Sequence, residues 1–136
     1  MLQNEIQWEP FRMAFPMLFD GKGLISSGVG NGWSRIVWDL CMNLEETARE
    51  QSAAGLPVIR ILQVKTQDGV LCFLLENPTE SSLALTHRAI AQSRIVCEVC
   101  GEAGVQTSLY GWFRTLCAAH ASAWTRWTDD PVDWSE

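Results

Sequence analysis

Two short pairs of soft metal ligands constrain this chain more than any other feature of its sequence. Cys97 and Cys100 form the first pair, Cys117 and His120 form the second, and each pair encloses two other residues. A Cys-x-x-Cys pair and a Cys-x-x-His pair joined by a loop supply the four donors that a tetrahedral Zn²⁺ ion requires. The sequence therefore predicts that these four residues bind one zinc ion.

Four protein ligands leave no coordination position for water or substrate, so the spacing predicts a structural zinc site. Gly101 and Gly104 allow the chain to turn back after the first pair, and a short strand or loop through Tyr110, Trp112 and Phe113 returns it to the second. The second pair has the spacing of one helical turn, which puts both side chains on the same side. The alternative is that the cysteines are ordinary core residues that bind no metal.

The chain is acidic and contains enough apolar residues for one core. It has 136 residues, of which 47% are hydrophobic, and a formal net charge of -6. Three zinc-bound thiolates would make it about one unit more negative. This charge disfavours nonspecific binding to phosphate backbones and favours a partner protein with a basic surface.

The remaining cysteines and the apolar pattern of the chain indicate the cellular compartment in which the protein folds. Cys41 and Cys72 lie inside apolar segments, which is typical of reduced thiols that pack as small hydrophobic residues. Residues 1–6 lack the basic and apolar pattern of a leader, and no apolar run is long enough to cross a bilayer. We expect a cytoplasmic protein with no membrane segment.

The order of elements predicts an α+β fold with an amphipathic helix, a β-hairpin, a second helix and a C-terminal zinc-ribbon-like knuckle. We expect one compact domain over residues 1–136. An arm rich in aromatic residues, glycine and proline occupies 1–30, and the helix-hairpin-helix core follows over 31–93. The zinc module spans 94–128, and an acidic tail spans 129–136.

Local patterns predict the first helix and the hairpin. Apolar residues recur at helical spacing over 33–51, with Asn31 as a candidate N-cap. Two strands over 58–65 and 70–75 are rich in β-branched residues, and the Asp68-Gly69 pair between them favours a tight hairpin turn. Because both strands are largely apolar on both faces, we expect helices or the arm to cover the sheet.

A second helix is predicted from Asn77 as cap and Pro78 at the first helical position, and it runs to about Ser93. One of its faces carries Leu83, His87 and Ile90. We therefore expect His87 to be a partly buried core residue, with a catalytic or ligand role as the alternative.

Aromatic residues at both ends of the chain have two interpretations. The apolar residues of the arm are Trp8, Phe11, Met13, Phe15, Met17, Leu18 and Phe19, and the aromatic ones among them either cover the core or form a contact surface. Near the carboxyl end, tryptophans alternate with carboxylates and form a candidate contact for a cationic partner: Trp124, Trp127, Asp129, Asp130, Asp133 and Trp134. The alternative is that Trp124 and Trp127 pack on the domain and that the tail is solvated.

With these motifs, the chain resembles a family of small, largely uncharacterised proteins of bacterial genomes, prophages and plasmids. The likeness covers 31–121 and rests on Gly32-Trp33, Leu40-Cys41, Val64-Lys65, Gly69-Val70-Leu71-Cys72-Phe73, the Cys-Glu-x-Cys-Gly-x-x-Gly at 97–104, Trp112 and the Thr-Leu-Cys-x-x-His at 115–120. Relatives carry basic residues about where Gln67 and Cys72 stand here, so a nucleic-acid role for the hairpin is weakened. The resemblance implies a mobile-element setting and a metal site, and it implies no activity.

These observations favour a non-enzymatic protein that inhibits or regulates a protein partner, such as a toxin immunity protein or an anti-CRISPR protein. The alternative is a zinc-ribbon adaptor or transcriptional regulator that binds nucleic acid through Arg88, Arg94, Arg114 and Arg126. A small enzyme is the third alternative, although the sequence has neither a nucleophile with a paired base nor a phosphate-binding loop.

Overall fold

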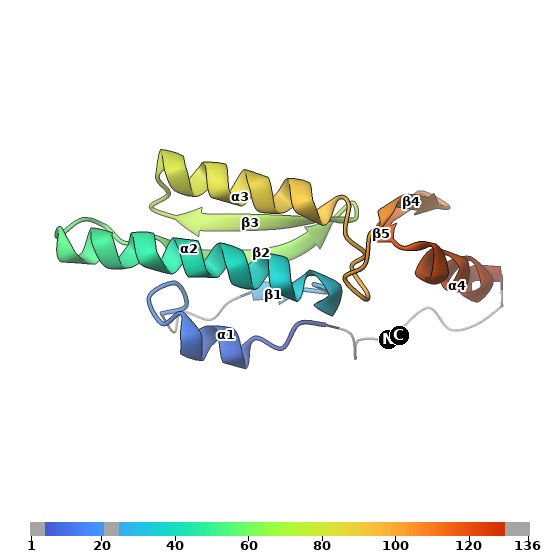
Figure 1. Cartoon of the computed structure of the whole chain (residues 1–136), viewed down its shortest axis with the longest axis horizontal. Helices are drawn as coiled ribbons and strands as arrows, with labels where there is room; N and C mark the ends of the chain where they lie inside the picture. Colours follow the sequence, from blue (N-terminus) through green and yellow to red (C-terminus); the bar gives the residue numbers. More distant parts are fainter. Residues whose placement is uncertain (1–4, 21–24, 130–136) are drawn as a thin grey trace.

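The protein consists of a three-stranded sheet covered by two long helices, with a smaller two-stranded sheet and its own helix at one end (Figure 1). The computed structural model describes residues 5–20 and 25–129. The elements in chain order are α1 (Glu9–Ala14), β1 (Ile25–Ser27), the 3₁₀ turn η1 (Asn31–Trp33), α2 (Ser34–Ala53), β2 (Arg60–Gln67), β3 (Val70–Glu76), α3 (Glu80–Ser93), β4 (Val105–Leu109), β5 (Trp112–Leu116) and α4 (Ala118–Asp129). The predicted α+β fold with a C-terminal knuckle is confirmed.

The larger sheet has the order β1-β2-β3, with β1 parallel to β2 and β2 antiparallel to β3. The predicted hairpin is present. Its turn residues Asp68 and Gly69 adopt the positive φ angles of 52° and 80° that a two-residue turn requires. α2 and α3 pack against each other and cover one face of this sheet (Figure 1). The short strand β1 was missed in the sequence, since the glycines around it obscure any strand pattern.

The N-terminal aromatic residues cover the main core, as the first interpretation predicted. Phe11 and Phe15 are buried, and their rings meet the ring of Trp38 on α2 edge-on, with centroids 5.0 and 4.8 Å apart. Trp38 lies off the apolar stripe of α2, so α1 gives this side chain a partner that the helix pattern alone does not provide. The main core contains Trp33, Val37, Leu44, Ile59, Val64 and Leu71 among others.

The predicted helix caps were wrong at both helices. α2 follows Trp33, which makes no side-chain cap hydrogen bond, and Asn31 belongs to the preceding 3₁₀ turn. α3 is capped by Thr79, whose hydroxyl accepts a hydrogen bond from the Ser82 N–H at 3.0 Å, while the Thr79 N–H donates to the Ser82 hydroxyl at 2.7 Å. Asn77 instead adopts a φ of 55° and donates from its side-chain amide to the Val58 carbonyl. The cap therefore lies two residues later than the proline pattern indicated.

The buried face of α3 is also different from the predicted one. His87 is exposed and Leu83 is 42% exposed, so the expectation of a partly buried core histidine is wrong. The residues that α3 buries are small, namely Ser82, Thr86, Ala89 and Ser93. Small side chains let the helix approach the sheet closely, and the Ser93 hydroxyl accepts a hydrogen bond from the Leu71 N–H at 3.1 Å.

The substitution Thr79→Ala should destabilise the fold by about 1 kcal/mol, because it removes the side chain that caps α3. Urea denaturation of both proteins measures this difference. Ser81→Ala is the matched control, since Ser81 is exposed and bonds only to the Thr79 hydroxyl among the contacts described. An effect of Ser81→Ala as large as that of Thr79→Ala would contradict the assignment of the cap.

Candidate metal centre

Three elements bring the four predicted ligands together. Cys97 and Cys100 lie on a tight turn that the Gly101 N–H closes by donating to the Cys97 carbonyl at 2.9 Å, and Gly101 has a φ of 85°. Cys117 joins β5 to α4, and His120 lies in the first turn of α4. The hairpin of β4 and β5 returns the chain between the two pairs, as the sequence predicted.

The donor atoms have the spacing of a tetrahedral metal site. All four lie within 4.8 Å of one another. The His120 Nδ1 lies 3.6 Å from the Cys97 sulfur and 3.2 Å from the Cys117 sulfur, and the Cys100 and Cys117 sulfurs are 3.8 Å apart. Metal bonds of about 2.3 Å to sulfur and about 2.0 Å to nitrogen put tetrahedral donors about 3.5–3.8 Å apart. The cluster therefore fits one metal ion with three sulfur ligands and one nitrogen ligand.

The backbone around the first pair favours negative charge on Cys97. Burial raises the pKa of this thiol, but N–H groups of Cys117, Cys100 and Val99 donate to its sulfur and bring the pKa down to about 7. The Glu102 N–H lowers the pKa of Cys100, yet burial and the neighbouring sulfurs of Cys97 and Cys117 outweigh it, and the pKa of Cys100 is raised. A second thiolate is thus unfavourable beside the first unless a cation binds between them.

Glu98, which lies between the first two cysteines, fixes the knuckle against β5. Its carboxylate accepts hydrogen bonds from Arg114 Nε at 2.9 Å and from the Thr115 N–H at 3.2 Å, although the side chain is almost fully buried. The Arg114 guanidinium also lies over the ring of Trp124 on α4, 5.6 Å from its centroid. Glu98 and Arg114 thereby link the knuckle, β5 and α4 into one unit.

Trp124 packs on the domain, which is the second of the two interpretations that the sequence left open for it. Trp124 is 9% exposed and packs with Cys97 and Leu116 in a small core beside the metal site. The side chains of Trp127 and Asp129 lie outside the described residues, as do Asp130, Asp133 and Trp134. The tryptophan nearest to the ligands in sequence therefore stabilises the metal module (residues 95–129) and is not available to a partner.

Residues 30–33 hold the knuckle against the main core. The Gly32 N–H donates to the Glu98 carbonyl at 2.9 Å, and the Trp33 indole donates to the Val96 carbonyl at 2.8 Å. A Cβ atom at Gly30 would lie 2.2 Å from the Glu98 carbonyl oxygen, and one at Gly32 would lie 2.2 Å from that of Cys97. Only glycine permits this close approach of the two backbones.

The turn of the β2–β3 hairpin forms a second contact with the metal module. The buried Thr115 hydroxyl donates to the Gly69 carbonyl at 2.7 Å, and the Gln106 side-chain amide donates to the Asp68 carbonyl at 2.9 Å. A Cβ atom at Gly69 would lie 3.0 Å from the Arg114 Cα, so the two hairpins touch through their backbones. The metal module is thus fixed at two separate places on the main core.

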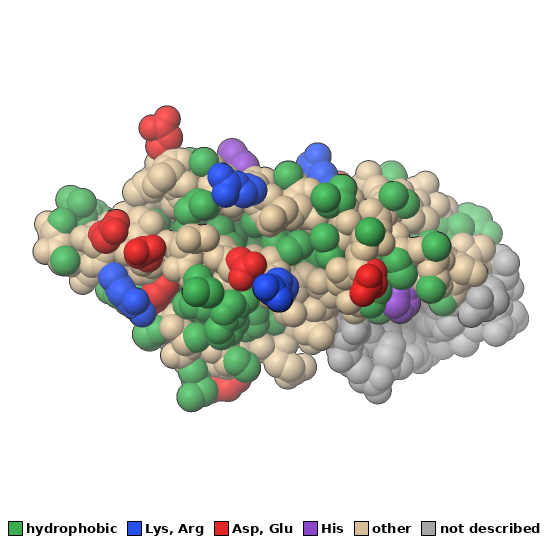
Figure 2. Space-filling model, in the orientation of Figure 1, with side chains coloured by type: hydrophobic (Ala, Val, Ile, Leu, Met, Phe, Trp, Pro, Cys, Tyr) green, Lys and Arg blue, Asp and Glu red, His purple; other side chains and the backbone are tan. Residues whose placement is uncertain are grey.

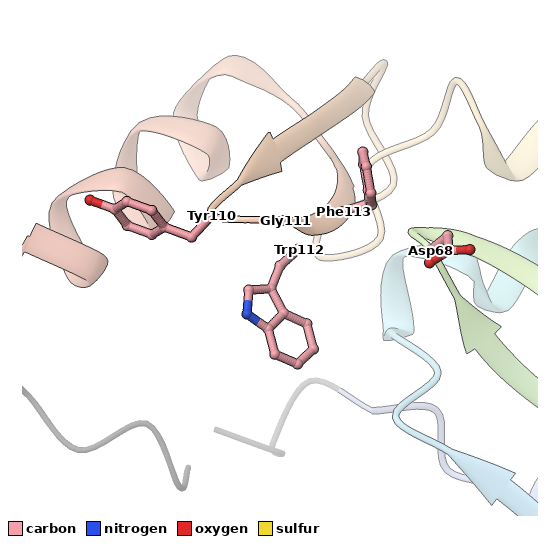
Figure 3. A pocket seen from close by; sticks show the side chains of 5 residues that line it. All are labelled: Asp68, Tyr110, Gly111, Trp112 and Phe113. Atoms are coloured by element: carbon pink, nitrogen blue, oxygen red, sulfur yellow. The ribbon is translucent and has the colours of Figure 1, made fainter.

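Large aromatic residues project from the β4–β5 hairpin, which the sequence reasoning treated only as a connection. Tyr110 is 78% exposed, Trp112 is 73% exposed and Phe113 is also exposed. We call these three residues the aromatic tip. Together with Gly111 they line a hollow of about 440 Å³ whose opposite side is Asp68 (Figure 3). The signal in the sequence was the aromatic-Gly-aromatic run, since Tyr110 and Gly111 have the positive φ angles of a tight turn and therefore lie at its tip.

Among residues 5–20 and 25–129, no helix combines the length and the apolar character needed to span a membrane. Comparison of the sequence with protein-family models and with curated proteins, and of the fold with solved structures, found no match.

Proposed function

We propose that this protein is a non-enzymatic binding protein that inhibits or regulates a protein partner with a basic surface, and that a structural zinc ion holds its binding region in place. The observation that carries the proposal is the aromatic tip, which projects from the same hairpin that connects the two ligand pairs. The proposed binding residues and the metal ligands therefore belong to the same module of an acidic chain.

Zinc is the ion that this donor set favours. Three thiolates and one imidazole in tetrahedral arrangement are the ligands of structural zinc sites, whereas magnesium and calcium take oxygen ligands in larger shells. Because the four protein ligands complete a tetrahedral shell, the ion would have no position for a substrate. The ion would instead contribute free energy to the folding of the metal module.

The exposed side chains of the module support a protein partner. Tryptophan and tyrosine are the residues that contribute most to protein interfaces when a partner buries them. On the face shown in Figure 2, Lys and Arg side chains alternate with Asp and Glu and form no continuous basic surface of the kind that binds nucleic acid. Arg114 donates from its Nε to the Glu98 carboxylate and its guanidinium lies over the Trp124 ring, so part of its binding capacity is already used within the module.

The family resemblance of the signature at 97–120 supports a mobile-element setting in the cytoplasm. In that setting the partner would be a toxin, a CRISPR effector or another protein that the element must control. The partner would have the basic surface that an acidic chain with a net charge of -6 attracts.

Co-expression with the products of neighbouring genes tests this function. We expect one basic protein to elute with the chain in a single peak of defined mass on size-exclusion chromatography, and Trp112→Ala should weaken the complex roughly tenfold or more. Met13→Ala is the matched control, since Met13 is 74% exposed on α1. If no protein partner is found and a gel shift shows salt-dependent binding to nucleic acid, the proposal is wrong.

A further inference from the structure

We infer that the hollow between the two hairpin turns binds an arginine side chain of the partner protein. This inference rests on the proposed function and assigns it a specific contact. The hollow is lined by Asp68, Tyr110, Gly111, Trp112 and Phe113. Its volume of about 440 Å³ is large enough for one long side chain together with water.

The two sides of the hollow are held at a fixed separation. Asp68 lies on the β2–β3 turn, and its carbonyl accepts a hydrogen bond from Gln106 on β4. Gly69 next to it is bonded to the Thr115 hydroxyl on β5. In Figure 3, Trp112 and Phe113 leave β5 in opposite directions, and Asp68 lies across the gap from them. The carboxylate and the aromatic rings therefore belong to different hairpins that the fold joins rigidly.

The lining has the chemistry that recognises a guanidinium group. Its lining residues are one carboxylate and three aromatic residues besides Gly111, with no basic residue. Because Trp112 and Phe113 point in opposite directions (Figure 3), a guanidinium group in the hollow would stack on one of these rings. A guanidinium group stacks on aromatic faces and donates two parallel hydrogen bonds to a carboxylate, which an ammonium group cannot do. Among the described residues, no Lys or Arg side chain forms a salt bridge with Asp68, so its carboxylate has no such cation within the chain.

The charge of the lining also indicates which class of ligand the hollow binds. A phosphate or an acidic peptide would meet the Asp68 carboxylate with no basic residue in the lining to offset the repulsion. A purely apolar side chain would cover the Asp68 carboxylate without pairing with it, which costs free energy. A cationic side chain can pair with the carboxylate and stack on one of the rings, and arginine does so with a planar group that matches both.

Titration of the full-length, metal-loaded protein with short capped peptides tests the inference. The probes are acetyl-Gly-Arg-Gly-amide and the same peptide with citrulline, which has the shape of arginine without its charge. We expect the arginine peptide to shift the NMR resonances of the Trp112 indole N–H and the Gly111 amide in a saturable way. It should bind roughly fivefold or more tightly than the citrulline peptide.

Asp68→Asn is the informative variant, because an Asn-Gly turn is at least as favourable as Asp-Gly and the fold is retained. It should reduce binding of the arginine peptide to the level of the citrulline peptide. Glu46→Gln, which removes an exposed carboxylate from α2, should leave binding unchanged. Equal binding of both peptides, no effect of Asp68→Asn, or shifts of the same resonances by a ten-nucleotide oligothymidine would each overturn the inference.

The outcome also separates this inference from the proposed function. If a basic partner co-elutes with the Asp68→Asn variant as tightly as with the unchanged protein, the proposed function stands and the arginine contact is wrong. If no protein partner exists but the arginine peptide binds through Asp68, the hollow recognises arginine and the proposed function fails.

Discussion

Replacing Cys117 by serine should abolish metal binding and unfold the metal module while the main core stays folded. Structural zinc contributes about 10–16 kcal/mol to the folding of small zinc domains. Among the described residues, the small core beside the site consists of Cys97, Leu116 and Trp124 with four partly buried residues packed against them, and a buried large apolar side chain contributes about 1.5–3 kcal/mol. That core cannot replace the metal, so the module depends on the ion.

Elemental analysis of protein purified without chelator measures the first effect, with about one zinc per chain expected for the unchanged protein and almost none for Cys117→Ser. Hydrogen exchange measures the second, through loss of protection over residues 95–125 and its retention over 34–76. Cys72→Ser is the control, since Cys72 is half-buried on β3 and outside the cluster. Full zinc content in Cys117→Ser, or little zinc in the unchanged protein, would refute the metal assignment.

The substitution Gly32→Ala should destabilise the protein by about 3 kcal/mol or more, because the new Cβ atom meets a backbone that cannot move aside. It would lie 2.2 Å from the Cys97 carbonyl oxygen and 2.6 Å from the Glu98 carbonyl carbon. The knuckle would have to separate from residues 30–33, which also breaks the Gly32 hydrogen bond to Glu98. The cost is therefore steric and falls on the junction between the metal module and the core.

Gly55→Ala separates this steric effect from ordinary backbone strain. Gly55 has a φ of 74° and nothing within 4 Å of an added Cβ, so alanine there costs only about 1–2 kcal/mol of strain. Urea denaturation of both variants gives the comparison, and the zinc content of Gly32→Ala shows whether the module still binds metal. A smaller effect at Gly32 than at Gly55 would mean that the two backbones do not approach as closely as described.

The features that could be predicted from the sequence are those that local chemistry determines. The Asp68-Gly69 turn and the two ligand pairs each depend on a few residues close together in sequence, and all of them lie where the spacing indicated. The apolar stripe of α2 was visible for the same reason. α1 and β1 were missed because prolines and glycines interrupt the arm, and only contacts with Trp38 and β2 give these short elements their stability.

The orientation of α3 could not be predicted from apolar periodicity, because its buried face is made of small and hydroxyl-bearing residues. Thr86 donates its hydroxyl hydrogen to the Ser82 carbonyl, and Ser93 bonds to the Ile90 carbonyl, so burial leaves these groups satisfied. The side with Leu83 and His87 looks more apolar in the sequence yet faces solvent. The side of α3 that is buried depends on how closely this helix approaches the three-stranded sheet, which apolar periodicity does not indicate.

The position of the aromatic tip could also not be predicted from the sequence. Trp124 and Trp112 are the same residue type, but Trp124 is covered by Arg114 and the small core, whereas Trp112 projects from a hairpin tip. Those differences arise from contacts between residues far apart in the chain. A count of tryptophans and carboxylates near the carboxyl end therefore did not distinguish the buried Trp124 from the exposed Trp112.

The contact between the two hairpins gives the strands β2 and β3 a second role, because their length sets the position of the turn that meets the metal module. Their turn must reach the β4–β5 hairpin with the carbonyls of Asp68 and Gly69 in place to accept hydrogen bonds from Gln106 and Thr115. Two residues more in each strand would carry the turn about 7 Å too far, and two fewer would leave it as much too short. The length of this hairpin is therefore as strictly determined as the spacing of the metal ligands, and differences in chain length between related proteins should occur in other segments.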